Sequence, residues 1–80
     1  MTIYEQAKAA ELETDSHESD LYIKDGPEAR RLVGGYEFAC NVRRFRSQID
    51  GAIWFDVPFA FDPWWKARER AQATEWRATG

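Results

Sequence analysis

The stretch of sequence that decides the fold is YEFACNVRRFRSQIDGAIWFDV, residues 36–57. Aromatic and β-branched residues, which favour strands, stand on both sides of Asp50-Gly51, and this pair is typical of tight turns between antiparallel strands. We therefore predict a β-hairpin over this stretch, with one strand at Tyr36–Gln48 and the other at Ala52–Val57.

Two hairpin registers are compatible with the turn. A two-residue loop sets Phe45 opposite Asp56. A three-residue loop with Gly51 in the left-handed conformation forms three other pairs: Phe45 with Phe55, Arg44 with Asp56, and Arg46 with Trp54. We prefer the second register, because it contains an aromatic pair, an ion pair and an arginine on an indole ring. The even-numbered apolar residues 38–42 are out of phase with Phe45, so we expect a bulge near Arg43.

The segments around the hairpin contain helix signals and one strand signal. Thr2 and Glu5 form a capping box, which predicts a helix that begins there and runs to about residue 13. Pro27 and Gly34-Gly35 are typical of the start and end of a second, short helix. Residues 21–24 favour a short strand, and residues 14–20 are polar and acidic, as in a solvated loop.

The last helix begins at Asp62-Pro63, with the aspartate as the N-cap. Its periodicity predicts a packing stripe of mostly small residues, Trp64, Ala67, Ala71, Thr74 and Ala78. A second line, turned away from the first, consists of Trp65, Glu69, Gln72 and Trp76.

Together these signals predict an α+β fold with the element order α-β-α-β-β-α. The small antiparallel sheet consists of the hairpin 36–57 and the short strand 21–24, and the N- and C-terminal helices pack on its Phe45/Phe55 face.

Length and composition agree with one small domain, residues 1–80. The single cysteine, Cys40, excludes an intrachain disulfide, which is typical of a cytoplasmic protein. We recognise no signal peptide, and no apolar stretch approaches the ~20 residues that cross a bilayer. Aromatic residues are 15% of the chain, more than a small core is expected to hide, so some rings should be exposed.

Catalytic and metal-binding patterns are missing from the sequence. His17 stands in the polar loop with no nucleophile organised around it, and Cys40 is expected to be a small core residue in a strand. One histidine and one cysteine do not supply the four ligands of structural zinc, and calcium-loop and phosphate-loop motifs are absent. We therefore expect no enzymatic activity, no catalytic residue, no metal and no cofactor.

The charge is distributed unevenly along the chain, and this is the best indication of function. Residues 1–28 carry a net charge of −6 and residues 29–49 carry +4, although the whole chain carries only −3. An acidic surface attracts basic partners. We predict that the partner is bound by five acids, Glu11, Glu13, Asp15, Glu18 and Asp20.

Two further groups are candidates for secondary partner contacts. One is the set of strand residues Arg43, Arg44, Arg46 and Trp54, which could also hold single-stranded nucleic acid by phosphate contact and stacking. The other is the tryptophan pair of the last helix, Trp65 and Trp76, since tryptophan often dominates interface energetics. Nearby acids balance the arginines, so direct nucleic-acid binding is the less favoured alternative.

The chain resembles a known group of proteins in three features: the opening MTIYEQAKAAELETDSHESDLYI, the acidic first third and the lack of catalytic residues. It resembles the anti-CRISPR proteins of bacteriophages, above all those that bind the type I-C surveillance complex, Cascade. The resemblance implies stoichiometric inhibition in the host cytoplasm, by occupying a Cascade surface that target DNA needs. We favour a monomer as the oligomeric state. It carries over no functional residue, because these proteins share no common motif, and the basic middle third departs from a pure DNA mimic. A small nucleic-acid-binding or regulatory phage protein is the alternative.

Overall fold

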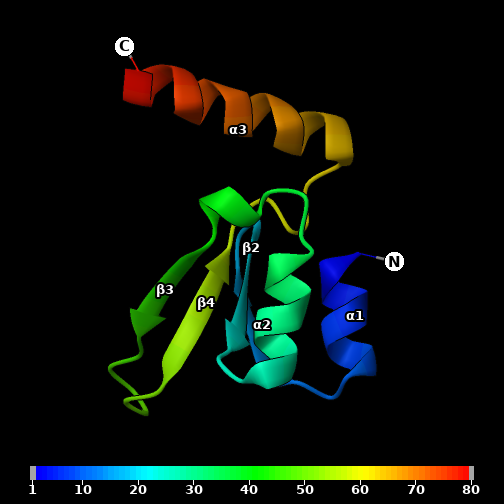
Figure 1. The fold of residues 1–80 in the computed structure, drawn as a ribbon, viewed down its shortest axis with the longest axis vertical. Helices are drawn as coiled ribbons and strands as arrows, with labels where there is room; N and C mark the ends of the chain where they lie inside the picture. Colours follow the sequence, from blue (N-terminus) through cyan, green and yellow to red (C-terminus); the bar gives the residue numbers. More distant parts are fainter. Residues whose placement is uncertain (1, 80) are drawn as a thin grey trace.

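A computed structural model of the chain describes the backbone of residues 2–79 and the side chains of residues 2–72. Four antiparallel strands form one sheet in the order β1-β2-β4-β3, with three helices around it (Figure 1). The elements follow the order α-β-β-α-β-β-α, with a short 3₁₀ helix, η1, before β3: α1 (Ile3–Ala9), β1 (Thr14–His17), β2 (Asp20–Lys24), α2 (Pro27–Gly34), η1 (Ala39–Asn41), β3 (Arg43–Arg46), β4 (Ile53–Val57) and α3 (Trp64–Thr79). The predicted α+β class and the strand at residues 21–24 are confirmed.

The strand β1 is the element that the sequence prediction missed. Residues 14–20, expected to be a solvated loop, form a tight hairpin in which His17 pairs with Asp20 and Thr14 pairs with Ile23. Glu18 turns the chain between the strands with a left-handed φ of 55°. No β1 side chain is buried, so the strand depends on backbone hydrogen bonds to β2 and carries no apolar alternation that would reveal it.

The second hairpin is shorter than predicted. Residues 36–42, expected to belong to a strand, form turns and η1, so that strand pairing starts only at Arg43. The connector replaces the expected bulge and resolves the phase conflict between its apolar residues and Phe45. It is tied to the end of β4, because the Tyr36 hydroxyl donates to the Pro58 carbonyl oxygen at 2.8 Å, and burial raises the pKa of Tyr36 to about 12.

Neither predicted register of this hairpin is correct. The observed pairs are Arg43 with Asp56, Arg44 with Phe55, Phe45 with Trp54, and Arg46 with Ile53. The loop has four residues, 48–51, because the Ser47 N–H donates to the Ala52 carbonyl oxygen at 2.8 Å and closes the hairpin there. Gly51 is left-handed, as predicted, with φ 71°. This change of register places Phe45 on one face of the sheet and leaves Phe55 on the other.

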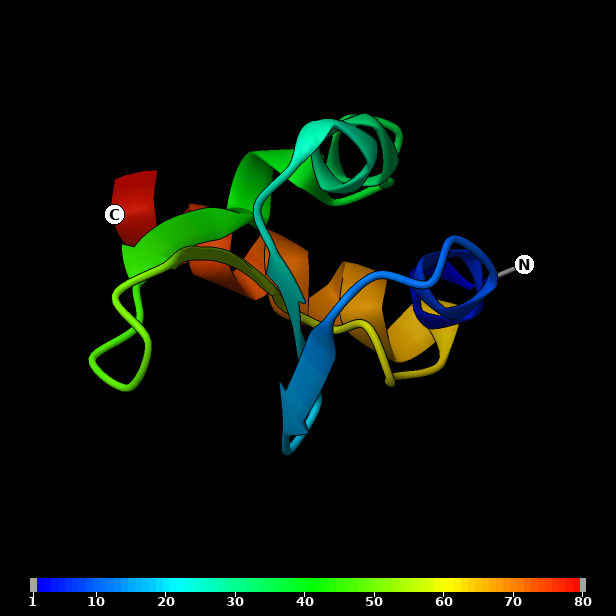
Figure 2. The same ribbon diagram turned by 90° about the horizontal axis from the view of Figure 1, so that it is seen from below.

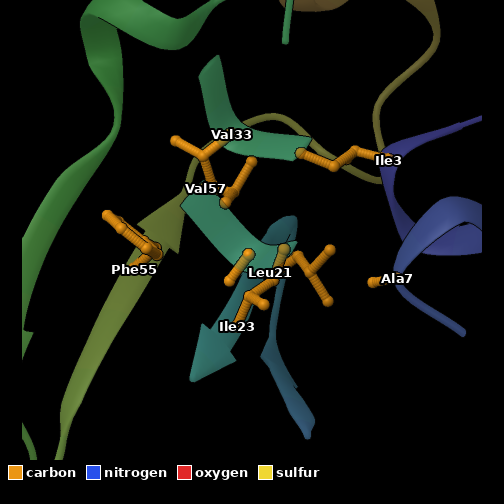
Figure 3. Close-up of a cluster of buried hydrophobic side chains, with 8 residues drawn as sticks. Ile3, Ala7, Leu21, Ile23, Val33, Phe55 and Val57 are labelled. Atoms are coloured by element: carbon orange, nitrogen blue, oxygen red, sulfur yellow. The ribbon is translucent and has the colours of Figure 1, made fainter. Parts of the chain in front are cut away.

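The hydrophobic core lies between the sheet and the first two helices. Figure 2 shows α1 and α2 on the same side of the sheet, and Figure 3 shows their apolar side chains meeting those of β2 and β4. Leu21, Ile23 and Val57 are fully buried, and each stabilises the fold by about 1.5–3 kcal/mol. The complete cluster is Ile3, Ala7, Leu21, Ile23, Ala29, Val33, Phe55 and Val57.

The helix α3 lies across one end of the sheet and not on its Phe55 face, so the predicted position of the C-terminal helix is wrong (Figure 1). Ala67 and Ala71 of the predicted stripe are buried. The Arg70 guanidinium holds the start of the helix, with Nη1 at 2.6 Å from Asp62 Oδ2 and 3.2 Å from the hydroxyl of Ser19 in the β1–β2 turn. Trp64, expected in the stripe, is instead exposed, and its Nε1 donates to Glu37 at 2.7 Å.

Candidate binding face

One face of the sheet carries no helix in the described part of the chain (Figures 1 and 2). Side chains alternate along a strand, so the neighbours of the buried residues in β2 and β4 point to this second face. The strand registers place them beside side chains of β1 and β3. We call this surface the open face, and its residues are Asp15, His17, Asp20, Tyr22, Lys24, Arg43, Phe45, Trp54 and Asp56.

A cross-strand row of polar residues runs over the open face. Asp15 lies opposite Tyr22, Tyr22 lies opposite Asp56, and Asp56 lies opposite Arg43. Asp20 lies next to this row on β2, on the same face as Tyr22. Neighbouring strands are about 4.8 Å apart, so carboxylates from three strands present their oxygens within the reach of one basic partner surface.

The five acids predicted to bind the partner are placed differently with respect to this face. Asp15 and Asp20 lie on it, and Glu18 lies in the turn between β1 and β2. Glu13 is at its margin, where its carboxylate contacts Lys24 Nζ at 3.1 Å. Glu11 ends α1 in a left-handed conformation with φ 57°, and its backbone N–H donates to the Lys8 carbonyl oxygen.

Asp56 is an acid of the open face that the sequence analysis did not select. The pKa of Asp56 is raised to about 6, first by burial and then by a hydrogen bond to the Asp20 carboxylate and the charge of that group, while Arg43 opposes the shift. Its Oδ1 atom is shielded from solvent and has no hydrogen-bond partner among the described residues. Asp56 and Asp20 therefore place two carboxyl groups close together in the middle of the acidic row.

An aromatic hollow lies beside the acidic row. The rings of Tyr22 and Phe45 meet edge to face with centroids 5.5 Å apart, and Trp54 lies opposite Phe45 in the adjacent strand. The Trp54 Nε1 atom lies 3.4 Å from Asp50 Oδ2 in the hairpin loop. The hollow has a volume of about 350 Å³ and is lined by Asp15, Tyr22, Phe45, Ser47, Ile49, Asp50 and Trp54.

The arginine group proposed as a secondary contact does not form one surface. Arg43 and Trp54 are on the open face, whereas Arg44 and Arg46 are on the opposite side of the sheet. Arg44 lies over the Phe55 ring, 6.0 Å from its centroid, and its Nη2 atom is 3.5 Å from Asp25. The expected pair of Arg44 with Asp56 is thus replaced by a contact on the other face.

Arg46 is held by the hairpin loop and not by an indole ring. Its Nη1 atom donates to the Gly51 carbonyl oxygen at 2.8 Å, and its cross-strand neighbour is Ile53. The expected stack on Trp54 is therefore not formed.

Of the two candidate tryptophans in α3, Trp65 is 64% exposed. Trp76 lies outside the residues whose side chains the structure describes, as do Thr74 and Ala78 of the predicted stripe. Glu69 and Gln72 are exposed, as their line on the helix predicts.

Other residues considered for chemistry lie apart from one another. His17 is exposed in β1. Cys40 is exposed in η1, contrary to the expected core position, and its Sγ lies 3.4 Å from Asn41 Oδ1. Over residues 2–72, His, Cys, Asp and Glu side chains form no group of three that could hold a metal ion. No described helix combines the length and the apolarity needed to cross a membrane.

Comparison with protein-family models, with curated proteins and with solved structures gives no significant match. The open face therefore has to be interpreted from its own residues. Sequence reasoning missed the hollow and Asp56, because both depend on the register of β3 and β4. The spacing of two between Glu13 and Asp15 was a signal for a strand that holds its acids on one face.

Proposed function

We propose that this chain is a non-catalytic binding protein whose open face docks on a basic surface of a protein or ribonucleoprotein complex. The observation that carries the proposal is the row of carboxylates on an uncovered sheet face, Asp15, Asp20 and Asp56, with Glu13 and Glu18 at its margins. Two cations of the same face, Lys24 and Arg43, are outnumbered by these acids.

The geometry of the row favours recognition of arginine and lysine. Asp15 and Asp20 come from strands that pair directly, and Tyr22 supplies a hydroxyl between Asp15 and Asp56. Carboxylates form charge-assisted hydrogen bonds to guanidinium and ammonium groups, and a field of one sign raises the rate of encounter. Because β2 and β4 are paired on both sides, the backbone positions of Asp20, Tyr22 and Asp56 are fixed before binding.

The resemblance to anti-CRISPR proteins supports a specific form of this function. In that form, the chain works in the host cytoplasm as a stoichiometric inhibitor of type I Cascade. Rows of carboxylate oxygens occupy basic side chains that would otherwise hold the phosphates of target DNA, because both present negative oxygens to the same cations. The alternative, direct binding of nucleic acid, receives no support from the arginines, since they lie on two faces.

Binding to purified type I-C Cascade tests the proposal. The chain should co-elute with the complex in size-exclusion chromatography and block its loading on target DNA in a gel-shift assay, at a one-to-one ratio and without modifying any component. The double charge reversal Glu13→Lys/Glu18→Lys, at two exposed positions, should weaken binding at least tenfold.

A matched control uses two acids outside the open face, Glu28 in α2 and Glu69 in α3. The variant Glu28→Lys/Glu69→Lys changes the net charge by the same amount and should bind like the wild type. Equal losses in the two double variants would contradict a specific role of the open face. Inhibition at substoichiometric amounts would show turnover and an enzyme, and single-stranded DNA binding by the isolated chain would favour the alternative.

A further inference from the structure

We infer that the aromatic hollow beside the acidic row receives one arginine side chain of the partner. The inference rests on the proposed function and names the group that the partner inserts. It is carried by three aromatic rings and two carboxylates that line one concavity, a combination that suits a planar cation.

The walls of the hollow are aromatic. Tyr22 and Phe45 meet edge to face, with an interplanar angle of 73°, and their contact leaves ring surface turned toward the hollow that they line with Trp54. Phe45 is 38% exposed, although it is a large apolar side chain in the middle of a strand. A guanidinium stacks on such ring faces and gains from the ring quadrupole.

The rim of the hollow supplies the negative charge. Asp15 Oδ1 accepts from the Ser16 N–H at 2.8 Å. Asp50 accepts from the Ala52 N–H at Oδ1, at 3.0 Å, and from the Trp54 indole N–H at Oδ2, at 3.4 Å. An ionised carboxylate has about four acceptor positions, so both groups keep free capacity toward a donor in the hollow. The hydrogen bond from Ala52 lowers the pKa of Asp50, and this acid therefore stays ionised at neutral pH.

Among the residues whose side chains the structure describes, no cation lines the hollow. On the open face, Arg43 pairs with Asp56 in the strand register, and Lys24 pairs with Trp54. Its Nζ atom lies 3.1 Å from Glu13, and Lys24 is not among the residues that line the hollow. Two other arginines of the hairpin, Arg44 and Arg46, lie on the opposite face of the sheet, and Arg46 donates to the Gly51 carbonyl oxygen.

Charge and shape distinguish arginine from other ligands that stack on aromatic rings. A nucleotide base could stack there, but its phosphate would be repelled by Asp15 and Asp50. A lysine carries a compact, strongly hydrated charge and has no flat surface to place between the rings. A guanidinium combines the plane that the rings accept with five donors for the two carboxylates.

The first test uses the full chain and a defined probe, the peptide acetyl-Gly-Gly-Arg-Gly-Gly-amide. In a ¹H–¹⁵N NMR titration, it should shift the Trp54 indole signal and the amides of Tyr22 and Phe45. The same peptide with citrulline, which is neutral and nearly isosteric with arginine, should bind at least fivefold more weakly, and so should the lysine peptide. Equal shifts with arginine and citrulline, or shifts confined to other residues, would overturn the inference.

Two variants and one control locate the site. Phe45→Ala removes a wall, and Asp50→Asn removes charge while its side-chain oxygen still accepts from the Ala52 N–H. Each variant should bind the arginine peptide at least fivefold more weakly than the wild type. Trp65→Ala changes an exposed tryptophan of α3 outside the hollow and should leave the titration unchanged. Unaltered binding by Phe45→Ala and Asp50→Asn would place the arginine elsewhere and overturn the inference.

A third measurement separates this inference from the proposed function. Neither Glu13 nor Glu18 lines the hollow, so their double reversal tests the acidic surface without touching the arginine site. If Phe45→Ala binds Cascade like the wild type while the double reversal fails to bind, the hollow inference is wrong and the proposed function stands. If neither variant loses affinity, both are wrong. If both variants lose affinity for Cascade and the arginine peptide binds specifically at the hollow, the result supports the hollow inference and the proposed function.

Discussion

At the scale of single residues, Asp56 is the group whose environment conflicts most with its charge. It lies between Tyr22 of β2 and Arg43 of β3, it faces the Asp20 carboxylate, and it lies at a partly shielded position. Burial disfavours the charged form of Asp56, and the nearby Asp20 carboxylate adds to the cost of ionising it, so Asp56 retains its proton to a higher pH. The cost of ionising Asp56 therefore falls on the open face, where the positive charge of a basic partner would reduce it.

The consequence is a specific dependence of stability on pH. The pKa of Asp56 is about 6 in the folded chain and roughly 3.9 in the unfolded chain. Its contribution to stability is therefore fully present below about pH 4 and is lost as the pH rises through 6. Asp56→Asn mimics the protonated form and should raise the free energy of unfolding at pH 7 by about 1 kcal/mol, after allowance for partial solvent exposure.

Urea denaturation at pH 4.5, 6 and 7.5 measures this effect. The difference between Asp56→Asn and the wild type should grow with pH. Asp15→Asn is the control, because Asp15 is an exposed acid of the same face, and it should change stability little at any of the three pH values. A variant Asp56→Asn that is less stable than the wild type at pH 7.5 would disprove the assigned environment.

At the scale of elements, the described part of α3 is attached to the fold by two small buried residues and a few hydrogen bonds. It lies across the end of the sheet (Figure 1), with Ala67 only 2% exposed and Ala71 only 7%. Trp64 and Arg70 attach its first turns to Glu37 and Asp62 through exposed hydrogen bonds. Small side chains at the buried positions let the helix approach closely, so the docking is sensitive to volume.

The substitution Ala67→Leu should destabilise the protein by about 1–3 kcal/mol, because a well-packed position does not accept three extra carbons without displacing the helix. The matched variant Glu69→Leu introduces the same side chain at an exposed position of the same helix and should change stability by less than about 0.5 kcal/mol. Thermal unfolding followed by circular dichroism compares the two. Equal stabilities would mean that α3 is not docked through Ala67.

At the scale of the whole molecule, the two faces of the sheet have different roles. The helices α1 and α2 use one face of the sheet for the core, and the other face keeps the carboxylates and the aromatic hollow. Binding through such a face should be fast at low salt and weaken as counterions screen it.

Raising the salt concentration from 0.05 M to 0.5 M should slow association with the partner by about tenfold, as the Debye length falls well below 10 Å, while the dissociation rate changes less. Surface plasmon resonance at four salt concentrations measures both rates. Trp65→Ala should stay within about twofold of the wild type throughout. Salt-independent association, combined with loss of binding in Trp65→Ala or Trp76→Ala, would move the interface to α3.

The sequence by itself determined the local features of this protein. The capping box at Thr2, the strand at residues 21–24, the left-handed Gly51 and the buried Ala67 and Ala71 all follow from neighbours in the chain, and all are confirmed. Caps, turns and helix stripes are short-range, and their physical causes are present within a few residues of each position.

Only the tertiary structure decided which side chains share a face. One additional residue in the loop at Gln48–Gly51 moved Phe45 from the expected core face to the open face, and it moved Arg44 and Arg46 from the face of Trp54 and Asp56 to the opposite one. The polar strand β1 exists because β2 offers it a free edge, and not because of its own side chains. Register and edge pairing depend on hydrogen bonds between segments distant in sequence, and a one-residue shift reverses every side chain of a strand. The binding face is therefore a property of the assembled sheet.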